Sequence, residues 1–581
     1  MLKKCFFMFK WWIFAYVILG CTIQFFSAFG IKVFQEILDK VAIIHNYNEI
    51  TQLVFIYGFL LIGTSIFNYL IEYPQVFLSN SILEKLKIMA LSKISKIDYR
   101  SYQNIGTGEM IKVIENGANA GTNIVFSFYL RILSELLPTV IFSLYFISFY
   151  NIKIMLVIAL GYVIIFVLTN LLLRFLYSIK SSLLQSQENM SRYSIRGFME
   201  LVVFRINKRY AKEINRLNHT ANDIVKKSSQ IRMIHESFFG IFSLLVSIIK
   251  IIIIIYGIKS ILSGDATVGI IVALTMFIDK VYTPVAIFNV IYVDYKLNRV
   301  TYNRFEEFLD APEDKNLNTG LDIKQLKGDI KFENVAFNYG NVKVLNNVSF
   351  TIPHGKSLAI VGLSGSGKST IVKLLLGLLK KDSGQILLDG TDIDAIKLDS
   401  FYNQLSYISQ DAPVFDTSIR NNIVFDDNLS DEEIYQILEN VFLKEKVLSL
   451  PEQLSTPVGE RGMKLSGGEK QRLAFGRVLA QNRDVVILDE PVSALDNITE
   501  KKIMNYILDY FAGKTVIIIA HRLNSIRNVD NILLVKNGDV IDQGDFNYLI
   551  NSNAYFKELW IKDEQDEEHK HEKEKSELSY N

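Results

Sequence analysis

The stretch that decides the fold of the C-terminal half is GLSGSGKST, Gly362 to Thr370. It follows a short apolar run, KSLAIV (356–361), which predicts a buried strand, and it leads into a predicted helix, KSTIVKLLLGLL (368–379). Glycines let backbone N–H groups approach an anion closely, and the helix N-terminus adds its positive end. The sequence therefore predicts a phosphate-binding loop formed by Gly362, Leu363, Ser364, Gly365, Ser366, Gly367, Lys368, Ser369 and Thr370.

Two carboxylates complete this site in the sequence. The run DVVILDE (484–490) predicts a buried strand that ends in Asp489 and Glu490. Lys368 is expected to reach the β and γ phosphates, while Ser369 and Asp489 hold Mg²⁺. Glu490, one residue further on, is placed to polarise an attacking water. The pattern predicts hydrolysis of a nucleoside triphosphate.

A second anion-binding helix start lies between these elements, in LSGGEKQR (465–472). Its glycines open the predicted helix EKQRLAFGRVLAQ, and the cradle residues are Ser466, Gly467, Gly468 and Glu469. One nucleotide does not need two such cradles in one domain. We therefore expect this cradle to cap the nucleotide of another copy, so that the protein dimerises around two nucleotides.

The N-terminal half contains long apolar runs typical of membrane helices. We predict six spans at about 12–34, 53–78, 125–149, 151–175, 238–262 and 266–291. The intervening segments 79–124 and 176–237 are polar, helical in pattern and rich in Lys and Arg. By the positive-inside rule both segments are cytoplasmic, as are the two termini. The chain is thus expected to be a multi-pass protein of the cytoplasmic membrane.

The remaining boundaries follow from composition. Residues 1–310 form the predicted transmembrane domain, 311–328 a polar linker, 329–561 an α/β domain and 562–581 a charged disordered tail. The formal net charge of +1 gives no electrostatic case for a nucleic-acid partner.

On these motifs, residues 329–561 resemble the nucleotide-binding domain of an ATP-binding cassette (ABC) protein, and the whole chain resembles an exporter half-transporter of that superfamily. The resemblance implies a six-helix transmembrane bundle fused to an α/β P-loop ATPase domain, with ATP and Mg²⁺ as cofactors. It assigns Tyr339 to adenine stacking, Gln410 to Mg²⁺ sensing and His521 to the γ-phosphate. It also assigns a dimer-facing loop to Ser493, Ala494, Leu495 and Asp496, and it implies that cytoplasmic loops near 98–110 and 197–212 contact the cassettes.

The resemblance implies an ATP-driven exporter that works by alternating access, with a homodimer favoured over a heterodimer because both half-sites are intact. An importer on the same fold and an ATP-gated channel or regulatory membrane protein are the alternatives. A natural-product peptide, an amphiphilic drug and a lipid all stay open as the exported substrate.

One lysine conflicts with its surroundings. Lys250 interrupts SIIKIIIIIYGI (247–258), and a charge inside a membrane is costly unless it faces a partner or a cavity. Lys250 lies 14 residues before Gly264 and Asp279 lies 15 after it, which puts both at one depth on neighbouring helices. We predict an intramembrane polar cluster in which Lys250 pairs with Asp279 or Glu135 and faces the translocation cavity. Lys280 is expected to point about 100° away from Asp279 and either to snorkel or to line the cavity.

Overall fold

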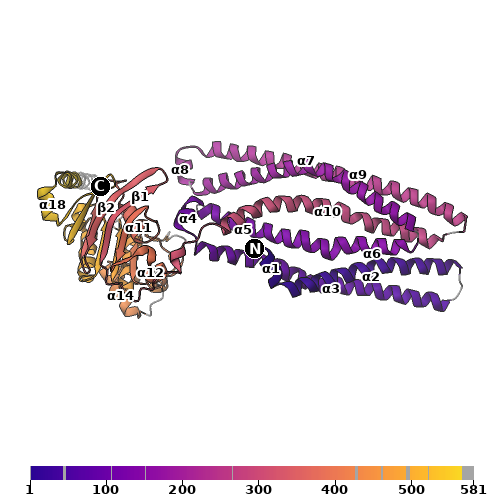
Figure 1. The fold of residues 1–581 in the computed structure, drawn as a ribbon, viewed down its shortest axis with the longest axis horizontal. Helices are drawn as coiled ribbons and strands as arrows, with labels where there is room; N and C mark the ends of the chain where they lie inside the picture. Colours follow the sequence, from indigo (N-terminus) through magenta and orange to yellow (C-terminus); the bar gives the residue numbers. More distant parts are fainter. Residues whose placement is uncertain are drawn as a thin grey trace. The chain divides into compact units, whose positions relative to one another are not determined.

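The computed structural model describes residues 2–43, 47–105, 107–150, 152–199, 201–264, 266–425, 429–459, 462, 464–491, 497–520 and 522–565. The chain divides into two compact units. The first comprises residues 1–95 and 104–311, and the second residues 96–103 and 312–581. Figure 1 shows long helices in the first unit and a strand-rich fold in the second.

The described part of the first unit is helical. Its elements are α1 (Leu2–Met8), α2 (Lys10–Ile43), α3 (Tyr47–Ile94), α5 (Thr107–Asn123), the π-helices η1 (Ile124–Leu130) and η2 (Ile132–Leu136), α6 (Leu137–Ser148), α7 (Ile152–Met199), α8 (Leu201–Ile206), α9 (Tyr210–Leu262) and α10 (Val268–Leu309).

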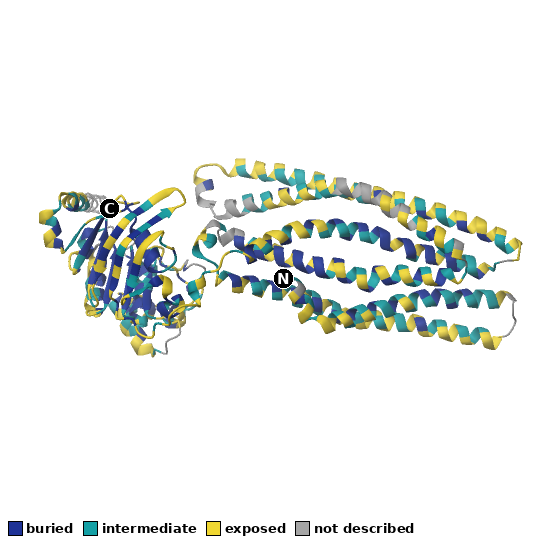
Figure 2. Ribbon diagram, viewed as in Figure 1, coloured by how far each residue is buried: buried dark blue, intermediate teal, exposed yellow. Residues whose placement is uncertain are grey.

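Five helical stretches among the described residues are long and apolar enough to cross a membrane: Lys10–Ala42, Tyr47–Ile94, Met110–Ser148, Tyr210–Leu262 and Val268–Leu309. They overlap five of the six predicted spans. The other predicted span, 151–175, lies in α7, and most side chains from 162 to 176 fall outside the described part. Only 6% of the most apolar window of α3 is buried, so this helix presents its apolar side chains outward, as expected of a lipid-facing surface (Figure 2).

The polar segments predicted to be helical begin and end as continuations of the membrane helices, although each is interrupted in its middle. Helix α3 runs on to Ile94, α7 to Met199, and α9 begins at Tyr210. Since an α-helix rises 1.5 Å per residue, the 53 residues of α9 extend about 80 Å, more than twice the hydrocarbon thickness. These helices therefore carry the membrane half well beyond the bilayer on one side.

Helices α5 and α10 touch at a glycine. A Cβ atom at Gly117 would lie 2.3 Å from the Cβ of Phe305, which is fully buried. At Gly240 on α9, by contrast, an added Cβ would meet no atom within 4 Å. The contact between α5 and α10 thus depends on the missing side chain at Gly117.

We expect Gly117→Ala to destabilise the membrane half by about 1–3 kcal/mol, because a methyl group cannot enter without moving a helix. The thermal unfolding midpoint of the detergent-purified protein is the measurement. Gly240→Ala is the matched control and should not lower the midpoint, because a Cβ meets no atom there and alanine favours a helix over glycine. Equal midpoints for both variants would contradict the packing described here.

The second unit is built on two sheets. The strands are β1 (Ile330–Tyr339), β2 (Val342–Ile352), β3 (Ser357–Val361), β4 (Ser383–Leu388), β5 (Thr391–Asp392), β6 (Leu405–Ile408), β7 (Val485–Asp489), β8 (Thr515–Ile519), β9 (Asn531–Lys536) and β10 (Asp539–Gly544). One sheet has the order β2-β1-β4-β5 and is antiparallel. The other has the order β10-β9-β3-β8-β7-β6, in which the five strands from β9 to β6 are parallel.

Helices and turns cover these sheets: α4 (Tyr99–Ile105), η3 (Lys315–Leu317), α11 (Lys368–Leu375), η4 (Ile393–Ala395), α12 (Leu398–Tyr402), α13 (Ile419–Ile423), α14 (Asp431–Asn440), α15 (Lys444–Leu448), η5 (Gln453–Ser455), α16 (Gly467–Gln481), α17 (Asn497–Tyr510), η7 (Leu523–Ile526) and α18 (Phe546–Ser552). Strands β3, β7 and β8 are buried at every position, because both faces of the parallel sheet are covered. The α/β domain predicted from the alternation of apolar runs is confirmed.

Residues 96–103 join the second unit although they lie between two membrane helices in sequence. The backbone N–H of Asp98 donates to the carbonyl of Pro312 at 3.0 Å, and that of Asp314 donates to the carbonyl of Lys96 at 2.8 Å. Tyr99 packs against the core of the second unit. This short segment thus contacts the second unit, which agrees with the contact predicted for the loop near 98–110 over residues 98–103.

The polar segment 311–328 also packs on the second unit over part of its length. Leu321 forms a β-bridge with Ile396, and Leu326 is 1% exposed within the core. The predicted tail 562–581 is described only as far as residue 565.

Candidate functional site

The loop from Gly362 to Gly367 joins β3 to α11, as the sequence predicts. A Cβ at Gly362 would lie 2.1 Å from the carbonyl oxygen of Val535, so only glycine fits there. Gly367 caps α11 with φ = 107°, a conformation that favours glycine. The loop backbone can therefore wrap closely around an anion at the start of α11.

Two charged side chains are buried beside this loop. The Lys368 ammonium donates hydrogen bonds to the carbonyls of Gly362 at 2.8 Å and Leu363 at 3.1 Å. Burial lowers the pKa of Lys368, although Glu490 and Asp489 act in the opposite direction. Burial, with the negative charge of Glu490, raises the pKa of Asp489 to about 6. Both residues are thus held in surroundings that disfavour their charges.

Glu490 lies at the end of β7 in a backbone conformation that a side chain rarely adopts, with φ = 49°. Left-handed non-glycine residues cost free energy and cluster at functional sites. Gln410 Nε2 donates a hydrogen bond to Glu490 Oε2 at 2.6 Å. The structure thus brings the predicted sensor glutamine and the predicted catalytic glutamate into direct contact.

The residues of this region fit a bound nucleoside triphosphate with Mg²⁺. A pocket of about 230 Å³ is lined by the loop residues, Val344 and Glu490. The hydroxyl of Ser366 is buried in the loop and has no hydrogen-bond partner in the described structure. Two adjacent acids, one of them buried with a raised pKa, gain from a divalent cation. The chemistry of this donor set matches phosphates and a hard metal ion.

The second predicted cradle begins α16, and it is a complete capping box. Ser466 Oγ accepts from the N–H of Glu469 at 3.3 Å, and Glu469 Oε2 accepts from the N–H of Ser466 at 2.8 Å. Burial tends to raise the pKa of Glu469, but the hydrogen bonds from Ser466 and the charges of Lys446 and Arg472 lower it overall. Ser466 and Gly467 are exposed. The helix start is therefore rigid and accessible.

Arg477 was not singled out from the sequence, yet it anchors this helix. It is 9% exposed and donates to the carbonyls of Asn422 at 2.9 Å and Pro413 at 3.2 Å. Its guanidinium also lies over the rings of Phe415 and Phe425. Burial lowers its pKa to about 10. A signal existed in the sequence, since an arginine interrupts the apolar face of the helix LAFGRVLA.

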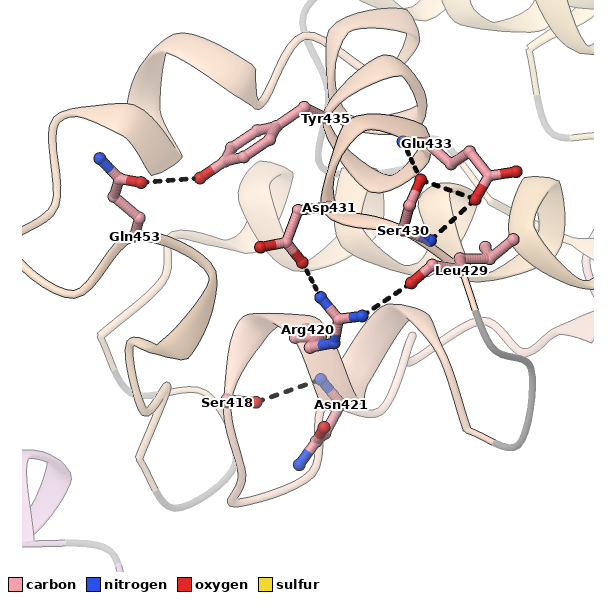
Figure 3. A network of polar contacts seen from close by, with 9 residues as sticks. All are labelled: Ser418, Arg420, Asn421, Leu429, Ser430, Asp431, Glu433, Tyr435 and Gln453. Carbon is pink, nitrogen blue, oxygen red and sulfur yellow. Dashed lines mark hydrogen bonds and ion pairs between the residues drawn. The ribbon is translucent and has the colours of Figure 1, made fainter.

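Figure 3 shows how the neighbouring helices α13 and α14 are joined. Arg420, on α13, pairs with Asp431 and donates to the carbonyl of Leu429 at 2.7 Å. Ser430 and Glu433 form a second capping box at the start of α14. Since α16 packs on both α13 and α14, this network fixes the layer that carries the second cradle.

Of the other residues predicted for the nucleotide site, the structure describes only Tyr339. Tyr339 ends β1, is 39% exposed and meets Phe337 edge-to-face at 4.8 Å. An exposed ring at this place is available for stacking. His521 and the loop of Ser493, Ala494, Leu495 and Asp496 lie outside the described residues.

In the membrane half, the structure brings together two members of the predicted polar cluster. Lys250 Nζ lies 2.6 Å from Asp279 Oδ1 and 2.7 Å from Oδ2, across α9 and α10. Glu135 does not join them, because its carboxylate accepts from Arg131 Nε at 2.9 Å one turn earlier on the same helical stretch. Lys280 points away from Asp279 and donates to Ser27 on α2.

Comparison with known proteins agrees with both halves of the chain. Residues 13–285 match the ABC transporter transmembrane region, and residues 345–493 match the ABC transporter family. ABC transporter B family member 24, mitochondrial, of Arabidopsis thaliana is 30% identical over 520 residues, covering 87% of this chain and 75% of that protein. A solved structure of a bacterial Atm1-family ABC exporter with ATP bound has the same fold, with a TM-score of 0.83 at 23% identity over 95% of this chain and 98% of that one.

A further relative is the mitochondrial iron–sulfur clusters transporter ATM1 of Candida glabrata, 36% identical over 312 residues. That match covers 52% of this chain, which spans only 43% of the length of the relative. The chain belongs to the ABC transporter family, as a half-transporter in which one transmembrane region is fused to one ATP-hydrolysing domain that drives transport.

Proposed function

We propose that the protein is an exporter that works as a dimer of two identical chains, with two ATP molecules at the interface of their nucleotide-binding domains. The observation that supports this most directly is that one chain carries two anion cradles. The pocket of about 230 Å³ is lined by loop residues and Glu490, whereas Ser466 to Glu469, all described, do not line it. The exposed cradle at Ser466 is therefore available to the ATP of a second copy.

Within each site, the residues have distinct roles. Ser369, Gln410 and Asp489 would hold Mg²⁺, which neutralises charge that develops on the phosphate oxygens. Lys368 would turn from the loop carbonyls to the phosphates, and Glu490 would orient and deprotonate the attacking water. His521 would contact the γ-phosphate, and Ser493 to Asp496 would face the partner chain.

Coupling to the membrane half runs through short contacts. Tyr99 of α4 packs on the core of the nucleotide-binding domain, and the Lys373 ammonium of α11 lies 5.9 Å from the centre of its ring. Because α11 begins at the phosphate loop, a change at the nucleotide can reach a segment that leads directly into membrane helices. We propose that closure of the two domains switches the bundle between inward-open and outward-open states.

Four classes of compound are candidates for the transported substrate. A natural-product peptide, an amphiphilic drug and a lipid fit an exporter with an apolar bundle. The relatives named as iron–sulfur clusters transporters add an iron–sulfur compound as a fourth candidate. The membrane is the cytoplasmic one or, by analogy with the mitochondrial relatives, an organellar one.

Direction of transport separates the exporter from an importer and from an ATP-gated channel. Inside-out vesicles that contain the protein should accumulate a fluorescent amphiphilic dye when ATP is added. Vesicles with the Glu490→Gln variant should not. ATP-dependent loss of preloaded dye would favour an importer, and ATP-dependent equilibration without accumulation would favour a channel.

We expect the chain expressed alone to form a homodimer with ATPase activity, since both half-sites are intact in one sequence. The mass of the purified protein in a lipid nanodisc with ATP measures this. Ser466→Arg, which fills the exposed cradle with a bulky cation, is the matched variant and should hydrolyse little ATP. An inactive monomer from the unaltered chain would indicate a missing partner chain.

The Lys250–Asp279 pair gives a further prediction. We propose that it serves the translocation cavity; a purely structural ion pair is the alternative. Breaking either partner should lower stability, because an unpaired charge is left inside the membrane. The swapped pair, Lys250→Asp with Asp279→Lys, should restore folding. ATP hydrolysis is then measured with and without the transported dye. If the swapped pair also restores stimulation by the dye, the pair is structural; if stimulation is still lost, the pair contacts the substrate.

For this prediction, Lys259→Leu on α9 serves as the control, because it removes an exposed lysine without a described acidic partner. Unchanged thermal stability and unchanged transport in Lys250→Leu would contradict any role for the pair.

A further inference from the structure

A cavity of about 380 Å³ lies among α2, α3 and α10 in the membrane half. Its wall is mainly apolar and aromatic, with side chains such as Phe26, Ile31, Leu60 and Met276. Its polar lining includes the Ser27 and Thr64 hydroxyls, the Asp279 carboxylate and the Lys280 ammonium. A site of this size with few polar groups on an apolar wall is typical of a small-molecule pocket.

The cavity lies at membrane depth. Lys280 comes 12 residues after Val268, the first residue of α10 (280 − 268), which corresponds to about 18 Å along the helix. An ionisable side chain at such a depth is costly unless it faces a cavity, a partner or a ligand. Lys280 therefore needs a specific reason to be there.

The charges around the cavity do not balance. Asp279 is engaged by both oxygens with the Lys250 ammonium, which approaches from α9. Within the described residues, Lys280 makes its hydrogen bond to the Ser27 hydroxyl, and no carboxylate lies within 4.0 Å of its ammonium. Asp279 and Lys280 line the cavity, and Lys250 neutralises Asp279 from outside it. The three side chains carry two positive charges and one negative charge, so the charge left over is the Lys280 ammonium.

We propose that this cavity binds an anionic amphiphile. The Lys280 ammonium pairs with the carboxylate or phosphate, Ser27 donates its hydroxyl proton to the same group, and the apolar wall holds the hydrocarbon part. A charge-assisted hydrogen bond is stronger than one between neutral groups and selects for negative charge. The Lys250–Asp279 pair keeps the neighbouring carboxylate from competing for Lys280.

That the amphiphile is also exported rests on the function proposed above, whereas its binding does not. The test therefore measures binding without ATP. The protein is placed in nanodiscs of neutral phosphatidylcholine, and radiolabelled dodecanoate is the probe. We expect saturable binding that weakens at least about tenfold in Lys280→Gln, as expected for losing an ion pair of about 1.4 kcal/mol.

Three further measurements sharpen the test. Lys280→Arg keeps the charge and should bind within a few-fold of the unaltered protein, which also covers the case in which Lys280→Gln fails to fold. Lys259→Gln, a lysine on α9 that does not line the cavity, is the matched control and should bind normally. Dodecyltrimethylammonium has the same chain with the opposite charge and should not compete.

The source of the anion is distinguished by adding phosphatidylglycerol to the nanodiscs. Competition with dodecanoate would assign the site to an acidic membrane lipid, and its absence would assign it to an amphiphile from solution. Equal binding of dodecanoate by the unaltered protein and Lys280→Gln, or no saturable binding to either, would overturn the proposal. ATPase activity measured on the same sample tests the exporter function separately.

Discussion

Glu490→Gln is expected to lower ATP hydrolysis at least about a hundredfold, the cost of removing a general base. Glutamine has nearly the same shape, so ATP should still bind at Lys368 and the loop glycines. The carboxylate that accepts the Gln410 amide at 2.6 Å is lost, and with it the group that would take a proton from water. Steady-state phosphate release by the purified protein measures the effect.

The same variant should accumulate as a closed dimer when ATP and Mg²⁺ are present, because the two domains cannot reopen without hydrolysis. Crosslinking or single-particle imaging would detect that state. Glu452→Gln, an exposed glutamate of the same domain, is the control and should hydrolyse ATP normally. Hydrolysis near the unaltered rate in Glu490→Gln would remove Glu490 from its catalytic role.

Much of the nucleotide-binding fold could be predicted because its signals are local. The apolar run before Gly362 is β3, and the run before Asp489 is β7, buried at all five positions. Each strand contains four consecutive apolar residues, a pattern typical of a strand covered on both faces, and the loop glycines mark the turn into α11. The capping box at the start of α16 is also a local signal, because its two residues, Ser466 and Glu469, are three positions apart in the sequence.

The features that could not be predicted depend on long-range packing. The hydrogen bonds of Arg477 to two carbonyls of the segment before α14 join positions 55 and 64 residues apart in sequence. The sequence also did not predict the π-helical stretch around Arg131 and Glu135. The i, i+4 spacing of these two residues explains why Glu135 pairs with Arg131 and not with Lys250. Depth counted along a helix gives the level of a side chain but not the direction in which it points.

Asp489→Asn should abolish hydrolysis and yet stabilise the protein in the absence of nucleotide. The buried carboxylate is a predicted Mg²⁺ ligand, so its loss should cost at least about a hundredfold in ATPase activity. Burial and Glu490 raise its pKa from 3.8 to about 6. Because one pKa unit corresponds to about 1.4 kcal/mol, ionisation of Asp489 costs the folded domain about 3 kcal/mol at neutral pH.

The sign of this effect can be followed with pH. The folded domain binds the Asp489 proton more tightly than the unfolded chain does, so its ionisation lowers stability as pH rises from about 4 to about 6. An asparagine side chain cannot ionise, and the thermal midpoint of Asp489→Asn should therefore exceed that of the unaltered protein by an amount that grows between about pH 4 and about pH 6 and then levels off. Asp484→Asn, the same substitution directly before β7, is the matched control and should hydrolyse ATP normally.

Mg²⁺ and ATP together should reverse the order of stabilities, because the metal ion compensates the charge of Asp489 only where the carboxylate is present. The unaltered protein should gain thermal stability on adding both, and Asp489→Asn should gain much less. Protons compete with Mg²⁺ for this carboxylate, so the affinity of the unaltered protein for Mg²⁺ should fall as pH drops through about 6. A variant that is less stable than the unaltered protein without nucleotide at pH 7 would show that Asp489 is held by favourable contacts, and the site would not be poised for a cation.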